Sequence, residues 1–343
     1  GKAAMSTIKD IARLSGYSIG TVSRVINNHP DVSEEAREKV EQVIREQNFK
    51  PNSNAKQLKQ QSNSAITIIV KGYENMFFES ILERVQAMLI DSGEEAAVAF
   101  LDEYANEVQA AIQLSASRKP KGFIFLGGNL EFFRQDFHNI DVPSVLLTNT
   151  AEELGFPNLS SFTTDDMEAG YKVIDYLAKK GHTEIGIIGG SASQIGSQIG
   201  FRRMAGCEKA FAENGIEFVE EKQYEPSRFS MSGGYESTQK LLKKNPKITA
   251  IFAIGDTIAI GAMRAIKDMG YSVPDDISII GYDGIESSRY TIPRLTTIRQ
   301  DTEALAKKGV EDILLRINYN HPSSNELIAF HMIEGESVIR INK

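Results

Sequence analysis

The chain has 343 residues, of which 41% are hydrophobic and 24% are charged, and this composition is typical of a globular protein of two or three domains. No run of about 18 apolar residues occurs, which excludes a transmembrane helix, and the first residues lack the apolar segment of a secretory signal. The single cysteine, Cys207, excludes an internal disulfide and a cysteine metal cluster. We therefore expect a cytoplasmic protein with no cofactor and no membrane association.

Charge is distributed unevenly along the chain. The formal net charge is −8, yet residues 1–62 carry ten Lys and Arg against seven Asp and Glu. A basic N-terminal segment thus precedes an acidic body. Because local rather than global charge governs contact with polyanions, the acidic total does not exclude nucleic acid as a partner of the N-terminal segment.

The N-terminal segment has the pattern of short capped helices. Thr7 is expected to cap a first helix over Ile8–Ser15, and Ser18 to cap a second from Ile19 to about Ile26, because their hydroxyls accept hydrogen bonds from free N–H groups at a helix start. Ser33 begins a third helix in the same way. Two short helices joined by a glycine-bearing turn predict a helix-turn-helix, although a plain helical hairpin with a solvated face fits this pattern equally well.

If the second helix enters the major groove, its outward side chains contact DNA. Arg24 suits guanine O6 and N7, and Ile19 suits a thymine methyl group. Small polar side chains suit phosphate oxygens, which position a protein without reading sequence. The expected DNA-contacting residues of this segment are Thr7, Ser18, Ile19, Gly20, Thr21, Ser23, Arg24 and Asn27.

Residues 52–64 form a polar stretch that composition identifies as a linker. After it, the spacing of the apolar residues along the chain changes. Apolar runs recur at 66–70, 96–101, 122–126, 144–148, 185–188, 250–254 and 277–281, with amphipathic segments between most of them. Strands that alternate with helices imply an α/β fold with parallel sheets covered on both faces. The number of units favours two similar halves that divide near 158–160.

Several motifs resemble the lactose-repressor (LacI/GalR) family of bacterial transcription regulators. They include T-I-K-D-I-A at 7–12, T-V-S-R-V-I-N at 21–27 and D-V-S-E-E-A-R-E-K-V at 31–40. Further along the chain, V-P-D-D-I-S at 273–278 and P-R-L-T-T-I-R-Q at 293–300 also match. The ordered matches extend over the whole chain.

The resemblance implies a helix-turn-helix headpiece at 5–51, a hinge at 52–64 and an effector-binding and dimerisation core at 65–343. The core is expected to resemble periplasmic sugar-binding proteins, with subdomains at about 65–159 plus 289–320 and 160–288 plus 321–343. The hinge matches the family pattern at Asn52, Ala55 and Leu58. This implies a helix that forms on DNA and inserts Leu58 into the minor groove, whereas composition alone favours a stray linker leucine.

Parallel sheets bind ligands beyond the carboxyl ends of their strands. Tyr73 and Phe77 follow the first core strand and suit stacking on a sugar ring or a base. The resemblance places effector contacts at Arg203 and Asp256, and less strongly at Asp283 and Gln300. Asp256 also precedes an expected helix, so that a role as its N-cap is an alternative. The family usually has Asn at the position of Gly255, which leaves the class of effector open.

These observations predict a ligand-responsive transcription regulator, expected to repress carbohydrate-utilisation genes. We expect a homodimer that binds a pseudo-palindromic operator in double-stranded DNA, with a sugar-type small-molecule effector in the core. A purine or a protein co-regulator is the alternative within this class. A solute-binding protein and an α/β enzyme with a helical appendage are the alternatives outside it. The sequence shows no nucleophile–base or metal-ligand spacing that favours an enzyme.

Overall fold

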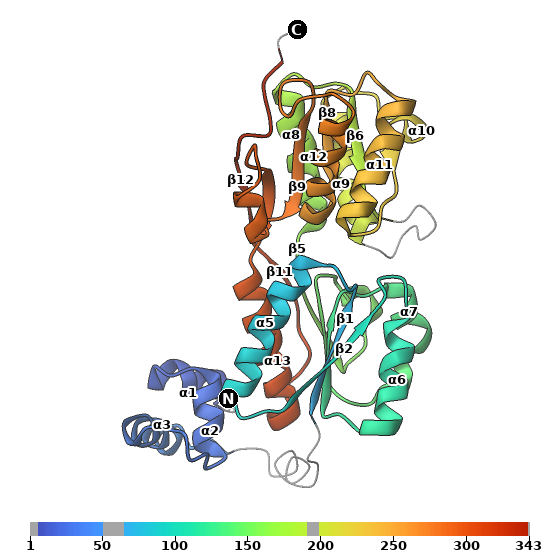
Figure 1. Cartoon of the computed structure of the whole chain (residues 1–343). Coiled ribbons are helices and arrows are strands. Elements are labelled where there is room, and N and C mark those ends of the chain that lie inside the picture. Colours follow the sequence, from blue (N-terminus) through green and yellow to red (C-terminus); the bar gives the residue numbers. More distant parts are fainter. Residues whose placement is uncertain (1–5, 51–64, 191–198, 342–343) are drawn as a thin grey trace.

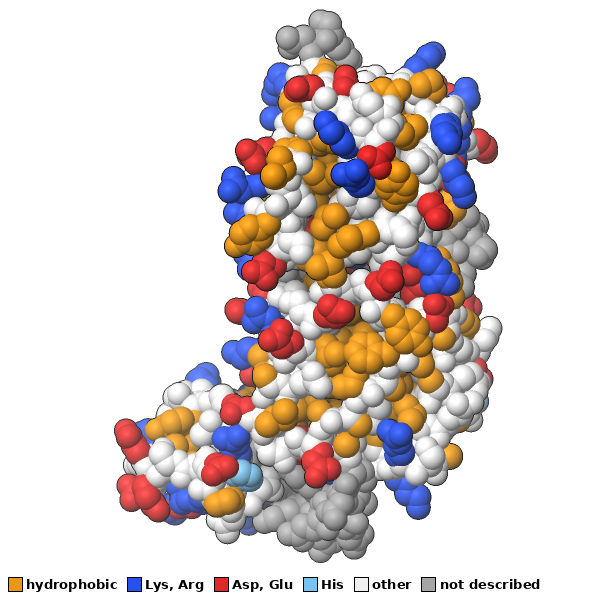
Figure 2. All heavy atoms as spheres, viewed as in Figure 1, with side chains coloured by type: hydrophobic (Ala, Val, Ile, Leu, Met, Phe, Trp, Pro, Cys, Tyr) orange, Lys and Arg blue, Asp and Glu red, His pale blue; other side chains and the backbone are white. Residues whose placement is uncertain are grey.

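The computed structural model describes residues 6–50, 65–190 and 199–341. It consists of a small headpiece, residues 6–50, and an elongated core of two lobes stacked end to end (Figure 1). The headpiece lies against the far end of the first lobe (Figures 1 and 2). The last described residues of the chain lie at the opposite end of the molecule (Figure 1).

The headpiece contains the predicted helices with their predicted caps. Its helices are α1 (Ile8–Ser15), α2 (Ile19–Ile26) and α3 (Glu34–Glu46). Thr7 and Asp10 form a capping box on α1, and the hydroxyl of Ser18 accepts from the N–H of Thr21 at the start of α2. The three helices are held together by apolar side chains, of which Ile11, Val22 and Val40 are fully buried.

The first lobe is built on a six-stranded parallel sheet with the strand order β11-β5-β4-β3-β1-β2. The strands are β1 (Ile66–Lys71), β2 (Ala96–Leu101), β3 (Gly122–Leu126), β4 (Ser144–Leu147), β5 (Leu159–Thr164) and β11 (Asn325–Ile328). The helices of this lobe are α5 (Met76–Asp91), α6 (Glu107–Arg118), α7 (Leu130–Asp136) and α13 (Thr302–Tyr319). α5 and α13 pack side by side on one face of the sheet, while α6 and α7 cover the other (Figure 1).

The second lobe repeats this architecture with the strand order β12-β10-β9-β8-β6-β7. Its strands are β6 (Ile185–Ile188), β7 (Tyr224–Glu225), β8 (Ala250–Ala253), β9 (Ser278–Asp283), β10 (Thr296–Gln300) and β12 (Phe330–Ile333). All neighbours are parallel except β12, which runs antiparallel to β10. The helices are α8 (Asp166–Lys179), α9 (Ile199–Glu213), α10 (Glu220–Gln223), α11 (Met231–Lys244) and α12 (Asp256–Asp268).

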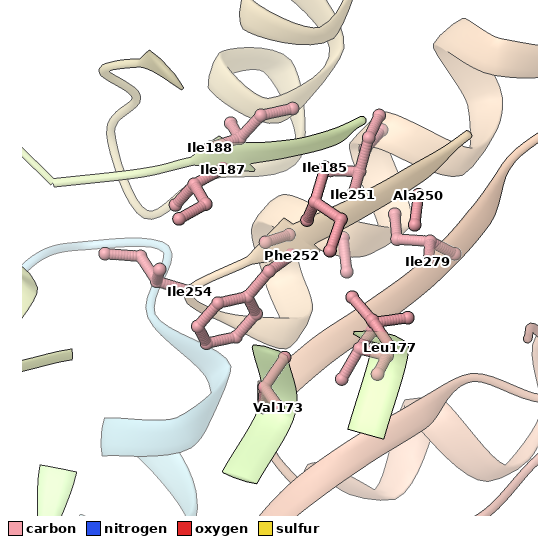
Figure 3. Close-up of a cluster of buried hydrophobic side chains, with 14 of the residues drawn as sticks. Val173, Leu177, Ile185, Ile187, Ile188, Ala250, Ile251, Phe252, Ile254 and Ile279 are labelled. Carbon is pink, nitrogen blue, oxygen red and sulfur yellow. The ribbon is translucent and has the colours of Figure 1, made fainter. Parts of the chain in front are cut away.

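Both faces of the second sheet are buried, which explains why its strands read as continuous apolar runs. In Figure 3, Val173 and Leu177 of α8 face Phe252 of β8, and all three side chains are fully buried. Burial of each such side chain contributes on the order of 1.5–3 kcal/mol to stability. Among the described residues, no helix is both long and apolar enough to cross a membrane.

The chain passes between the lobes three times, at positions that differ from the predicted subdomain limits. β5, predicted to begin the second subdomain, pairs with β4 of the first sheet, and β11 joins β5. β10, predicted for the first subdomain, lies in the second sheet beside β9. The crossings therefore follow Thr164, Gln300 and Ile328. The prediction failed because β5, with the sequence LSSFTT, lacks the apolar run that marks the other strands.

Candidate DNA interface and effector cleft

One side of α2 carries four of the eight headpiece residues predicted to contact DNA. Gly20, Ser23, Arg24 and Asn27 recur at intervals of three and four residues, which places them on one face of the helix. We call these four residues the recognition face. Ser18 and Thr21 lie at the start of the helix, where their hydroxyl oxygens are 3.0 Å apart.

Two predictions about exposure on α2 are wrong. Ile19 retains only 6% of its surface and packs into the apolar cluster of the headpiece, because its position at the start of α2 turns it inward. Ser23 retains 2%. Thr7 is exposed, but its hydroxyl already caps α1. Ala55 and Leu58 of the predicted hinge lie outside the described residues.

A cleft of about 380 Å³ lies between the two lobes, at the carboxyl ends of the strands of both sheets. Its size is typical of small-molecule sites. Four predicted residues line it, namely Tyr73, Phe77, Arg203 and Asp283. Tyr73 is largely exposed at its edge, whereas the other three are buried.

Arg203 extends from α9 into a buried network of contacts that fixes its orientation. Its Nε donates to Oδ1 of Asp166 at 2.9 Å, and its guanidinium stacks 3.6 Å from the ring centre of Tyr282. The Tyr282 hydroxyl donates to the same carboxylate oxygen. Burial raises the pKa of Asp166, although the charge of Arg203 opposes this rise. The pair thus presents one oriented guanidinium to the cleft.

Asp283 ends β9 beside this network. Gln300, the last residue of β10, donates from Nε2 to Oδ1 of Asp283 at 2.8 Å and accepts from the hydroxyl of Thr164 at 2.7 Å. Burial raises the pKa of Asp283 well above its ordinary value, with Arg203 acting in the opposite direction. Gln300 does not line the cleft, so that it positions Asp283 from behind.

Two residues of the cleft have backbone conformations that L-amino acids rarely adopt. Asp283 has a φ of 118° and Thr148, directly after β4, has a φ of 76°. For a β-branched residue such as Thr148 this region costs on the order of 1–3 kcal/mol. Such strain concentrates at binding and catalytic sites, and both residues line the cleft.

Side chains from opposite lobes meet across the mouth of the cleft. Nη1 of Arg228, between β7 and α11, lies 2.9 Å from Oδ1 of Asp102, and the N–H of Phe229 donates to Glu103 at 3.1 Å. The Arg228 guanidinium also stacks 4.4 Å from the ring centre of Tyr104. Hydrogen bonding with Arg228 lowers the pKa of Asp102, whereas burial raises that of Glu103. These contacts hold the two lobes together.

Asp256 is neither an effector-site residue nor a helix N-cap, the two roles that the sequence suggested for it. It does not line the cleft, because its carboxylate accepts from the N–H groups of Gly284 and Ile285 and from the hydroxyl of Thr297, at 2.8, 2.9 and 2.6 Å. It is not the N-cap of α12 either, since Gly255 holds that position without a side-chain bond. Asp256 instead ties α12 to the segment that follows β9.

Sequence reasoning missed several polar residues of the cleft. They are Asp102, Glu103, Tyr104, Asn129, Thr148, Asn149 and Arg228 in its lining, together with the apolar Phe229, and Asp166 behind the lining as the partner of Arg203. Most of them follow directly after β2, β3 or β4, so that the rule that identified Tyr73 after β1 also applies to them. Arg228 and Phe229 follow β7, which is only two residues long and leaves no apolar run to detect.

Comparisons with known proteins agree with this architecture. Residues 7–52 match "Bacterial regulatory proteins, lacI family", and residues 174–338 match "Periplasmic binding protein-like domain". The chain is 36% identical over 338 residues to the HTH-type transcriptional regulator MalR of Clostridium butyricum, covering 97% of this chain and 99% of the relative. It is 34% identical over 321 residues to the ribose operon repressor of Haemophilus influenzae, covering 94% of each.

A solved structure of the lac repressor dimer, bound to operator and the anti-inducer ONPF, is similar over the whole chain. It has a TM-score of 0.67 and 25% identity, and the match covers 98% of this chain and 100% of that one. The headpiece, the two-lobed core and the extent of these similarities lead to one identification. The chain belongs to the lacI family of bacterial regulatory proteins, and it is a DNA-binding transcription regulator rather than an enzyme.

Proposed function

We propose that this regulator is a repressor of carbohydrate-utilisation genes that binds a pseudo-palindromic operator as a homodimer and responds to a neutral sugar in the cleft. The observation that carries the proposal is the lining of the cleft, which combines aromatic faces with uncharged polar groups such as Asn129, Thr148 and Asn149. Aromatic faces suit the apolar side of a sugar ring, and amides and hydroxyls suit its hydroxyl groups. The name of the ribose operon repressor supports a sugar as well.

The charges of the cleft support an uncharged effector. Each cationic side chain that the described residues place in the lining has a carboxylate partner at 2.9 Å: Lys71 has Glu107, Arg203 has Asp166 and Arg228 has Asp102. A phosphate group needs cations or N–H donors that are free to bind it. A sugar phosphate could bind one of these cations only by displacing its carboxylate partner, which would then be left without a partner. This cost favours a neutral polyol over a sugar phosphate.

We infer that the effector acts by changing the angle between the lobes. A ligand bound between two lobes stabilises one relative orientation, and the operator-binding segments are attached to the first lobe at residue 65. A typical coupling free energy of about 1–3 kcal/mol changes operator affinity about 5- to 150-fold.

The homodimer is supported by an uncovered apolar face on the first lobe. β2 is the edge strand of its sheet and has the apolar sequence AAVAFL, yet none of its residues is buried. Figure 2 shows hydrophobic side chains gathered over this region. Ile90 at the end of α5 and Phe100 in β2 remain 66% and 44% exposed. Apolar strand edges left open in a monomer are typical of association surfaces.

A thermal-shift screen of the full chain tests the effector class. The panel contains neutral mono- and disaccharides, sugar phosphates and purines. A ligand at about 100 times its dissociation constant adds about 2.7 kcal/mol of stability, which this measurement detects as a higher melting temperature. We expect stabilisation by a neutral sugar, and the same sugar is expected to change the affinity of the chain for its operator.

The matched variants are Tyr73→Ala, at the edge of the cleft, and Tyr290→Ala, which changes another largely exposed tyrosine that does not line the cleft. Only Tyr73→Ala is expected to reduce the shift caused by the sugar. Stabilisation by a purine alone would overturn the sugar proposal and leave the DNA-binding identification intact. Stabilisation by a sugar without any change in operator affinity would overturn the coupling.

A further inference from the structure

The recognition face of α2 does not point to solvent in this structure. The far end of the first lobe covers it, where α5 and α13 both end (Figure 1). Leu315 and Tyr319 of α13 belong to the same apolar cluster as the headpiece helices, and the rings of Phe49 and Tyr319 are 6.1 Å apart. The headpiece thus shares part of its core with the first lobe.

The backbones of α2 and the first lobe approach each other closely. A Cβ atom on Gly20 would lie 2.9 Å from Oγ of Ser92 and 3.9 Å from its Cβ. The ring of His29, which follows α2, is 3.3 Å from the point that a Cβ of Gly93 would occupy. A side chain at position 20 would therefore collide with Ser92. The glycine at this position permits the close contact of α2 with the first lobe.

Polar contacts extend over the rest of the face. Arg24 pairs with Asp91 at 3.3 Å, and the hydroxyl of Ser23 lies beside that of Tyr319, where it opposes the rise of the Tyr319 pKa. Burial raises the pKa of Tyr319 to about 12. Nε of Arg24 is buried and has no hydrogen-bond partner among residues 6–50, 65–190 and 199–341. An unpaired buried donor is unfavourable, so that DNA, which offers acceptors to Arg24, can compete with this contact.

We propose that the core of this regulator sequesters its own recognition helix in the absence of DNA, through the contact of Gly20, Ser23 and Arg24 with Ser92, Tyr319 and Asp91. The contact and the operator occupy the same face of α2, so that they exclude each other. The apparent operator affinity is then the intrinsic affinity multiplied by the fraction of chains whose headpiece is released. The regulator has a self-inhibited state in addition to its effector response.

A disulfide between Gly20→Cys and Ser92→Cys tests the contact directly. The separation of 3.9 Å between the two Cβ positions falls within the range of about 3.5–4.5 Å that a disulfide needs. The natural Cys207 is buried, and burial raises the pKa of its thiol, so that it does not compete. The control pair combines Glu38→Cys on α3, outside the recognition face, with Ser92→Cys.

In the full chain without DNA, we expect the 20–92 disulfide to form within one chain under mild oxidation, and the control pair to remain reduced. Binding is measured with a duplex selected from a randomised 20-base-pair library by the reduced variant. The oxidised variant is expected to bind this duplex at least tenfold more weakly, with recovery after reduction. Saturating duplex is expected to slow formation of the disulfide.

Absence of the disulfide in a folded variant, a disulfide that joins two chains, or an oxidised protein that binds the duplex as before would each overturn the proposal. A second variant changes only the core. Asp91→Asn with Tyr319→Phe removes the polar partners of α2 and is expected to raise affinity about twofold to fivefold, the usual effect of an exposed ion pair. Asp141→Asn, which changes another exposed aspartate of the first lobe, is the control. If the double variant bound the duplex no more tightly than this control, the proposal would be contradicted.

Discussion

Asp256 is fully buried, and its carboxylate accepts three hydrogen bonds. Burial nevertheless raises its pKa to about 7 from an ordinary value of 3.8. The folded chain therefore holds this proton more tightly than the unfolded chain. The resulting contribution to stability is complete below about pH 4 and is lost as the pH rises through about 7, by up to about 1.4 kcal/mol per pH unit.

Asp256→Asn removes this dependence, because an amide oxygen accepts the same backbone N–H groups but cannot ionise. We expect the free energy of unfolding of the wild-type chain to fall, relative to that of Asp256→Asn, as the pH is raised from 4.5 to 7.5. Urea unfolding at several pH values measures the difference. A constant difference would contradict the assignment, and Asp141→Asn serves as the exposed control.

Arg24 carries a prediction about DNA sequence. If it reads a guanine, Arg24→Ala loses about 1–3 kcal/mol of discrimination at one position of each half-site. Selection of bound sequences from a randomised duplex measures this loss. Release of the headpiece from the core affects all sequences equally, so that it does not change the preference. Arg13→Ala, on the exposed side of α1, is expected to leave base preference unchanged.

The starts of the headpiece helices could be predicted to the residue, whereas the polar core strand β5 could not be predicted at all. Thr7 and Ser18 accept from N–H groups in the next turn, and this local chemistry fixes where α1 and α2 begin. β5 depends on distant partners instead. The hydroxyls of Ser160 and Ser161 bond to Asp312 and Asn325, more than 150 residues away. Its polar sequence therefore fits a buried strand only after the C-terminal segment is in place.

The same distinction applies to the two functional regions. Tyr73, Phe77, Arg203 and Asp283 could be placed in the cleft because they follow strands or match a family motif. The covering of α2 by the first lobe could not be predicted, because it depends on the shape of a surface formed by separate helices. A small residue such as Gly20 permits close contact between two backbones, but a single sequence does not show that such a contact is made.

The predicted hinge at 52–64 carries a test at the scale of one element. If Leu58 enters the minor groove, Leu58→Ala weakens binding to the operator much more than binding to random duplex, because only the bent specific complex contains the wedge. Competition binding with both duplexes measures the two affinities. Leu14→Ala, an exposed leucine of α1, is the control. Equal losses on both duplexes would contradict a wedge role for Leu58.

At the scale of the whole molecule, the apolar edge at β2 carries the prediction of a dimer. Phe100→Glu places a charge on this face and is expected to convert the dimer to a monomer in sedimentation velocity. Because a monomer contacts a single half-site, operator affinity is expected to fall roughly 100-fold or more. Met231→Glu changes a similarly exposed residue on α11 and is the control. A Phe100→Glu chain that still sediments as the wild type would contradict this interface.

The order of the strands also affects how the chain acquires its structure during synthesis. β11 and β12 form one outer edge of the first and second sheet, respectively, and only residue 329 separates them. Neither sheet reaches its full width until residues 325–333 have left the ribosome. The lobes therefore cannot mature one after the other, as consecutive domains do. A premature stop codon shortly after residue 320 would leave an open strand edge on both lobes and expose the product to aggregation.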